Sequence, residues 1–101
     1  MHSEIDAVEL LNRLKNGEKL NMLDVRGEIE YNTYNIGGEN IPLKNIGNGA
    51  LSIAANKNEE IIVICTAGLR SATAATLLTD RGYTNVRNLT GGLLAVRKLK
   101  H

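Results

Sequence analysis

The chain has 101 residues, 43% of them hydrophobic and 23% charged, with a formal net charge of +1. This length suits one domain with one modest core, and the small charge excludes strong attraction to nucleic acid or to a membrane surface. One cysteine makes neither an internal disulfide nor a thiolate metal site. We therefore expect a single domain over residues 1–101, a cytoplasmic location, no membrane-spanning segment and no bound metal.

The amino-terminal residues 3–17 have the pattern of a helix. Asp6 is a good N-cap, and Glu9 stands three residues later, as the return half of a capping box. Gly17 would end the helix. We interpret this segment as scaffold.

Residues 20–25 predict a strand that ends in charged residues. Asp24 at the strand end could take part in catalysis, but a cap of the next turn or a pair with Arg26 is the favoured interpretation. Residues 27–34 then predict a loop and a short polar helix.

The middle of the chain is rich in turn signals. Gly37 and Gly38 indicate a tight bend, and Pro42, the only proline, should lie near the end of a short edge strand. Residues 44–56 predict a loop followed by a short apolar helix, and residues 57–60 predict a polar turn.

Strands and helices alternate in the second half. Ile61–Ile64 is a continuous β-branched run, typical of a central parallel strand that is covered on both faces. A helix over 71–81, a strand over 83–89 and a helix over 93–99 follow. The whole pattern predicts an α/β domain with a mainly parallel sheet and helices on both faces. Ligands bind such sheets beyond the carboxyl ends of the strands, where Cys65 stands.

Residues 65–70 are the strongest candidate for an active site. They join a strand end to the first turn of a helix, where backbone N–H groups and the helix dipole favour an anionic thiolate at Cys65. Gly68 lets the backbone curl around the sulfur, so that the N–H groups form an anion-binding nest. Arg70 could clamp an anionic substrate, support the loop carbonyls or be a surface cation. The alternative for Cys65 is a small apolar core residue.

Several motifs along nearly the whole chain resemble those of single-domain rhodaneses, which are sulfurtransferases. They are Leu23-Asp24-Val25-Arg26, Glu30-Tyr31, Asn40-Ile41-Pro42-Leu43, Cys65-x-x-Gly68-x-Arg70-Ser71, Ala74-Ala75-x-Leu77 and Leu89-x-Gly91-Gly92. The resemblance implies a rhodanese-like α/β fold with a five-stranded, mainly parallel sheet and helices on both faces.

The resemblance also implies a ping-pong reaction. A sulfane sulfur passes from thiosulfate or a persulfide to the Cys65 thiolate, and from there to cyanide, a small thiol or an acceptor protein. Cys65 matches the family's nucleophile, and its substrate-binding loop is matched by Thr66, Ala67, Gly68, Leu69 and Arg70. No cofactor is implied, and we expect a monomer. Because Arg70 is the only cation in this loop, we expect the thiosulfate dianion to bind poorly and a less charged donor to be preferred.

Three other functions are compatible with parts of this pattern. A cysteine phosphatase needs a wider cradle than the four residues between Cys65 and Arg70 provide, and no aspartate lies in the turn. A non-enzymatic interaction module would not need the cysteine. Redox sensing through a sulfenic acid lacks a second cysteine to resolve it.

Overall fold

Five parallel strands form one sheet in the order β1-β5-β4-β2-β3. The computed structural model describes residues 2–47 and 55–100. The strands are β1 (Ser3–Ile5), β2 (Met22–Asp24), β3 (Glu39–Asn40), β4 (Ile61–Ile64) and β5 (Val86–Leu89). The predicted five-stranded parallel sheet is thus confirmed, with β4 at its centre.

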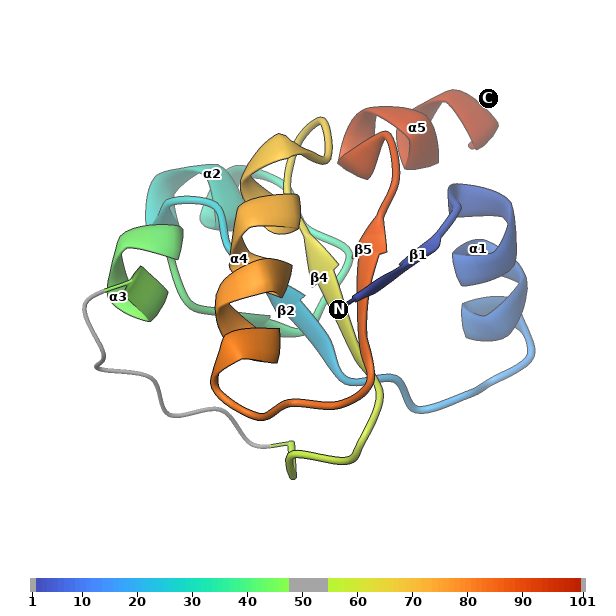
Figure 1. Ribbon diagram of the computed structural model, residues 1–101. Helices are drawn as coiled ribbons and strands as arrows, with labels where there is room; N and C mark the ends of the chain where they lie inside the picture. Colours follow the sequence, from blue (N-terminus) through green and yellow to red (C-terminus); the bar gives the residue numbers. More distant parts are fainter. Residues whose placement is uncertain (1, 48–54, 101) are drawn as a thin grey trace.

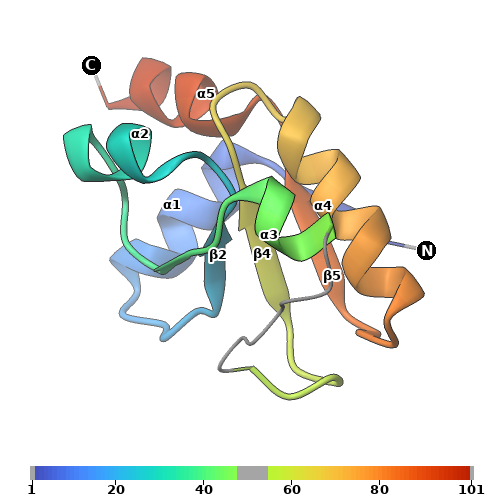
Figure 2. The ribbon, with the colours of Figure 1, turned by 90° about the vertical axis from the view of Figure 1, so that its left-hand side faces the viewer.

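Helices cover both faces of this sheet (Figures 1 and 2). They are α1 (Ala7–Lys15), α2 (Glu28–Thr33), α3 (Leu43–Gly47), α4 (Leu69–Asp80) and α5 (Gly92–Leu99). Helices α1 and α5 pack together on one face, and α3 and α4 pack together on the other. Helix α2 follows the carboxyl end of β2, the end of the sheet where the candidate loop lies. None of the described helices is long and apolar enough to cross a lipid bilayer.

Strand β4 contributes side chains to two separate cores. Ile61 and Val63 pack on the side of α3 and α4, whereas Ile62 and Ile64 pack on the side of α1 and α5. All four residues are buried. Burial on both faces explains why this strand has no polar side, as the continuous β-branched run predicted.

The predicted helix over residues 3–17 is wrong at its start. Ser3–Ile5 form strand β1, which pairs in parallel with β5. The N-cap assignment is confirmed, because the Asp6 carboxylate accepts a hydrogen bond from the Glu9 N–H at 2.8 Å. This cap ends the extended segment and begins the helix, so residues 3–5 remain free to pair with β5.

A second difference lies in the middle of the chain. Residues 43–47 were predicted to lie before the apolar helix, yet they form α3 directly after Pro42. Proline favours the first turn of a helix because it has no N–H to leave unpaired. The apolar helix predicted within 44–56 falls mainly on residues 48–54, which lie outside the described residues. Helix α4 begins at Leu69, two residues earlier than predicted.

Candidate active site

Cys65 lies directly after β4, at the carboxyl end of the central strand, and only 1% of its surface is exposed. The chain then curls back over the sulfur. The Gly68 N–H donates a hydrogen bond to Cys65 Sγ at 3.0 Å, and the Ser71 hydroxyl lies 3.2 Å from the same atom. The strand therefore delivers the sulfur into the first turn of α4, as the sequence predicted.

The surroundings of this sulfur favour its ionised form. Burial raises the pKa of the Cys65 thiol, but the Ser71 hydroxyl and the N–H groups of Ser71, Gly68 and Ala67 lower it by more. The pKa therefore lies below its ordinary value. Hydrogen-bond donors that converge on a thiolate produce this effect without any metal.

Two glycines shape the loop. Gly68 is the residue before α4 and has φ +98°, a left-handed conformation that other residues adopt only with strain. Gly92, at the start of α5, lies so close to the loop that a Cβ there would overlap the carbonyl groups of Cys65 and Thr66. Two hydrogen bonds hold this contact, from Leu93 N–H to the Cys65 carbonyl at 2.9 Å and from Leu94 N–H to the Thr66 carbonyl at 3.0 Å.

A series of buried hydrogen bonds connects the sulfur to β5. The Ser71 hydroxyl donates a hydrogen bond to the Asn88 side-chain carbonyl, and the Asn88 amide donates to the Gly68 carbonyl at 3.3 Å. Ser71 and Asn88 are both buried. Neither residue was assigned a role from the sequence. The signal that could have found Asn88 is its place two residues after Val86, on the same face of the strand, where Val86 packs into the core.

Arg70 forms a two-pronged ion pair with Glu30 of α2. The two guanidinium nitrogens lie 2.8 and 2.9 Å from the Glu30 carboxylate, and one also donates to the Thr66 hydroxyl at 3.2 Å. The Arg70 guanidinium lowers the pKa of Glu30 to about 2, so the carboxylate is ionised at neutral pH. Three roles were left open for Arg70, and the structure favours support of the loop. The guanidinium gives this support through its hydrogen bond to the Thr66 hydroxyl, and not through the loop carbonyl groups.

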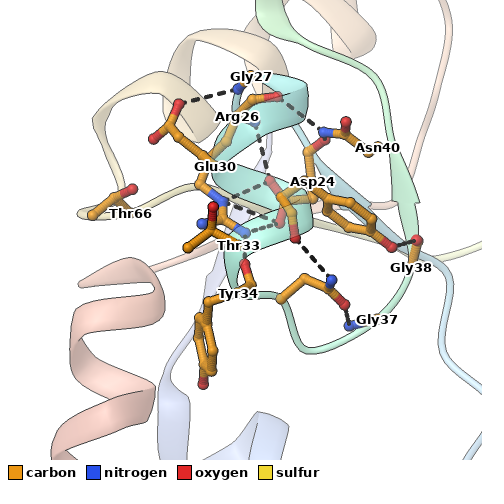
Figure 3. Close-up of polar contacts among 12 residues, drawn as sticks. Asp24, Arg26, Gly27, Glu30, Thr33, Tyr34, Gly37, Gly38, Asn40 and Thr66 are labelled. Carbon is orange, nitrogen blue, oxygen red and sulfur yellow. Dashed lines mark hydrogen bonds and ion pairs between the residues drawn. The ribbon is translucent and has the colours of Figure 1, made fainter.

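Helix α2 is itself held by a buried ion pair (Figure 3). The Arg26 guanidinium binds the Asp24 carboxylate at 2.8 Å and donates to the Tyr34 carbonyl at 2.6 Å, after the last residue of α2. Both side chains are buried. The favoured interpretation of Asp24 is thus confirmed: its carboxylate pairs with Arg26 and accepts from the Arg26 N–H. The pair anchors α2, which in turn presents Glu30 to Arg70.

All six predicted site residues lie together, four on the loop after β4 and two, Leu69 and Arg70, at the start of α4, but they face different surroundings. Cys65 and Gly68 are buried, whereas Thr66 and Arg70 are partly exposed. Ala67 is exposed, and Leu69 projects outward with 80% of its surface accessible. Glu30 was quoted from the sequence only as part of a motif, and its role as the partner of Arg70 was missed. Among the described residues, no cluster of three or more metal-ligating side chains is present.

The sequence is similar to a known domain family and to curated proteins. The model of the rhodanese-like domain family matches residues 6–99. The chain is 37% identical over 81 residues to the thiosulfate sulfurtransferase PspE of Escherichia coli, and the alignment covers 77% of each protein. It is 35% identical over 91 residues to the putative sulfur carrier protein YrkF of Bacillus subtilis, covering 89% of this chain and 48% of that longer protein.

A solved structure is similar in fold as well. The human single-domain sulfurtransferase TSTD1 superimposes with a TM-score of 0.79 at 25% identity, and the match covers 97% of this chain and 96% of that one.

Proposed function

Because the chain belongs to the rhodanese-like domain family, we propose that it is a sulfurtransferase that carries a sulfane sulfur on Cys65. The family predicted from the sequence motifs is confirmed, and so is the α/β fold. The observation that supports a persulfide mechanism best is the convergence of the Gly68 N–H and the Ser71 hydroxyl on the Cys65 sulfur. The Gly68 N–H, together with the Ser71 proton when it turns from Asn88 to the sulfur, would stabilise a persulfide anion at this position.

In the loading step, the Cys65 thiolate attacks the sulfane sulfur of the donor. With thiosulfate, a bond forms between Sγ and the outer sulfur, and the bond from that sulfur to the sulfite sulfur breaks, so sulfite leaves with the electron pair. The lowered pKa of Cys65 increases the share of thiolate, which favours attack without a separate general base. The product is a Cys65 persulfide inside the 65–70 loop.

In the unloading step, a nucleophilic acceptor attacks the outer sulfur of the persulfide. The bond between Sγ and the outer sulfur breaks, its electron pair stays on Sγ, and the Cys65 thiolate is restored. We propose cyanide or a thiol as the acceptor, on a small molecule or on a protein.

The ion pair between Arg70 and Glu30 bears on the choice of donor. Arg70 is the only cation in the 65–70 loop, and Glu30 already neutralises it at 2.8 Å. The thiosulfate dianion therefore meets little net positive charge at this site. PspE is named for thiosulfate, but for this chain we propose that thiosulfate binds weakly and that a persulfide of lower charge is the better donor.

Intact-mass measurement tests the proposed function directly. After incubation with thiosulfate or inorganic polysulfide, we expect wild-type protein to gain one sulfur atom and to lose it when cyanide is added. Cys65→Ser should gain none, because a hydroxyl does not form a stable persulfide. Absence of any sulfur gain with every donor, in protein that circular dichroism shows to be folded, would remove the enzymatic proposal.

A further inference from the structure

A cavity of about 300 Å³ adjoins the 65–70 loop on the side of α5. Thr66, the residue after Cys65, is part of its lining, and so is Arg97 of α5. Ile29 of α2 and Leu94 of α5 line it as well. A volume of this size accommodates a small organic molecule. The cavity therefore extends the site beyond the sulfur cradle.

The walls of this cavity include two exposed apolar side chains. Ile29 is 83% exposed and Leu94 is 49% exposed, although both are large aliphatic residues. Leu94 belongs to the turn of α5 that holds the Thr66 carbonyl, so its position next to the loop is set by the backbone. An apolar segment of a bound molecule would cover both side chains and remove their surface from water.

The cavity is lined by three charged side chains, and the ion pairs among the described residues leave one of them, Arg97, without a counter-ion. Arg26 is neutralised by Asp24, and Glu30 is neutralised by Arg70. Within residues 2–47 and 55–100, no carboxylate lies in ion-pair contact with Arg97.

The position of that cation is defined by an aromatic ring. The Arg97 guanidinium lies 4.7 Å from the centre of the Tyr34 ring. Figure 3 shows this ring beside the faded red ribbon of α5, on the residue that directly follows Thr33, the last residue of α2. Stacking on an aromatic face leaves the edge of a guanidinium free to bind a carboxylate.

We propose that this cavity is a specificity subsite, in which Arg97 binds a carboxylate of an organic thiol or persulfide whose sulfur reacts at Cys65. The proposal rests on the sulfurtransferase function proposed above. The bound molecule has an apolar segment against Ile29 and Leu94 and an anionic group remote from its sulfur. Leu94 and Arg97 are separated by about 4.5 Å along the helix axis, which a short alkyl chain spans. Such a molecule carries its negative charge to Arg97. Thiosulfate, by contrast, must place two negative charges next to Arg70, whose charge Glu30 already neutralises.

The reaction itself follows the unloading step. The thiolate of the bound acceptor attacks the outer sulfur, its new S–S bond forms, and the Cys65 Sγ–S bond breaks with the electron pair left on Sγ. The proton of the acceptor thiol passes to the outer sulfur as the thiolate forms, so the products are the acceptor's protonated persulfide and the Cys65 thiolate. Arg97 takes no part in these bonds and acts by positioning the acceptor.

Paired acceptors provide the first test. Protein loaded with sulfur by inorganic polysulfide is mixed with mercaptohexanoate or with mercaptohexanol, whose thiols are equally nucleophilic, and loss of the persulfide is followed by mass. We expect wild-type protein to prefer the acid by about fivefold, the upper range for an exposed charge pair. Arg97→Gln should bring the ratio close to one, and Arg97→Lys should retain part of it. Lys98→Gln, which removes the same charge from the next residue, should leave the preference unchanged.

A second measurement separates this proposal from the proposed function. Hexanoate and hexanol are titrated into the unloaded protein, and backbone amide NMR signals are recorded. We expect hexanoate to shift the signals of Leu94 and Arg97 in wild-type protein and not in Arg97→Gln, a result that needs no sulfur transfer. Equal discharge by the acid and the alcohol, or hexanoate shifts that persist in Arg97→Gln, would overturn the subsite even if Cys65 carries sulfur normally.

Discussion

At the scale of single residues, the chemistry depends on where one hydroxyl proton lies. Ser71 Oγ has one proton, and two acceptors compete for it: the Asn88 side-chain carbonyl and, once ionised, the Cys65 sulfur. The Asn88 amide is held by the Gly68 carbonyl, which directs the Asn88 oxygen at Ser71. Asn88 thus influences the thiolate without touching it.

Removing this hydroxyl should make Cys65 less reactive. In Ser71→Ala, we expect the pKa of Cys65 to rise, because the hydroxyl is one of the groups that lower it. Alkylation by iodoacetamide at pH 7 should slow by about fivefold, the equivalent of one hydrogen bond, and its pH profile should move to higher pH. Thr73→Ala is the matched control, since it removes an exposed hydroxyl of the same helix that donates to the Leu69 carbonyl. An unchanged pH profile in Ser71→Ala would show that the hydroxyl does not act on the thiolate.

At the scale of elements, the site is built by contacts between segments that are distant in sequence. The cradle itself was predictable, because the buried strand, Cys65, Gly68 and the start of the helix are adjacent along the chain. Glu30 lies 40 residues from Arg70, and Asn88 lies 17 residues from Ser71, so no local pattern reveals either partner. Strand β1 was missed for the same reason, since its three residues are recognisable only by their pairing with β5.

The contact between α2 and α4 makes a prediction about donor choice. In Glu30→Gln, Arg70 loses its counter-ion, so the 65–70 loop gains one net positive charge. We expect the concentration of thiosulfate needed for half-maximal sulfur loading to fall by about threefold, a modest effect because both side chains are partly exposed. Glutamine keeps the acceptor that binds the Gly27 N–H at the start of α2.

Glu28→Gln is the control for this change. It removes a carboxylate from the same helix, at an exposed position that forms no ion pair with Arg70. Thiosulfate loading should then stay at the wild-type level. Weaker loading in Glu30→Gln than in wild-type protein would mean that the carboxylate is needed to position Arg70, and that its charge is not what limits thiosulfate.

At the scale of the whole molecule, an ion-pair cluster ties the sheet together at the opposite end from Cys65. Glu60, just before β4, binds Arg13 of α1 at 2.6 Å and Arg87 of β5 at 3.4 Å. Glu9 of α1 also binds Arg87, at 2.8 Å. The hydrogen bonds and charge of Arg13 and then of Arg87 lower the pKa of Glu60, against the opposing effect of burial.

This cluster makes stability depend on pH in a defined direction. Because the pKa of Glu60 is lower in the folded state, its contribution is present above the unfolded value of about 4.3 and is lost as pH falls through the folded value. We expect Glu60→Gln to lower the free energy of unfolding in urea by about 1 kcal/mol at pH 7, with the difference narrowing below pH ~4. Glu59→Gln removes the same charge without touching either arginine, and it should remain near wild type. A constant difference from pH 7 to pH 3 would contradict the assigned ion pairs.

The contact between α5 and the 65–70 loop determines which way the peptide groups around the Cys65 sulfur point. A peptide group is rigid and planar, so its carbonyl and N–H point in opposite directions. Leu94 binds the Thr66 carbonyl on the side of α5, which turns the N–H of the same peptide, that of Ala67, towards the sulfur. Helix α5, which binds the carbonyl side of this peptide, thus orients a dipole that stabilises the negative charge of the sulfur. Gly92 allows the approach, so a methyl group there would disturb the electrostatics of the nucleophile from the far side of the peptide plane.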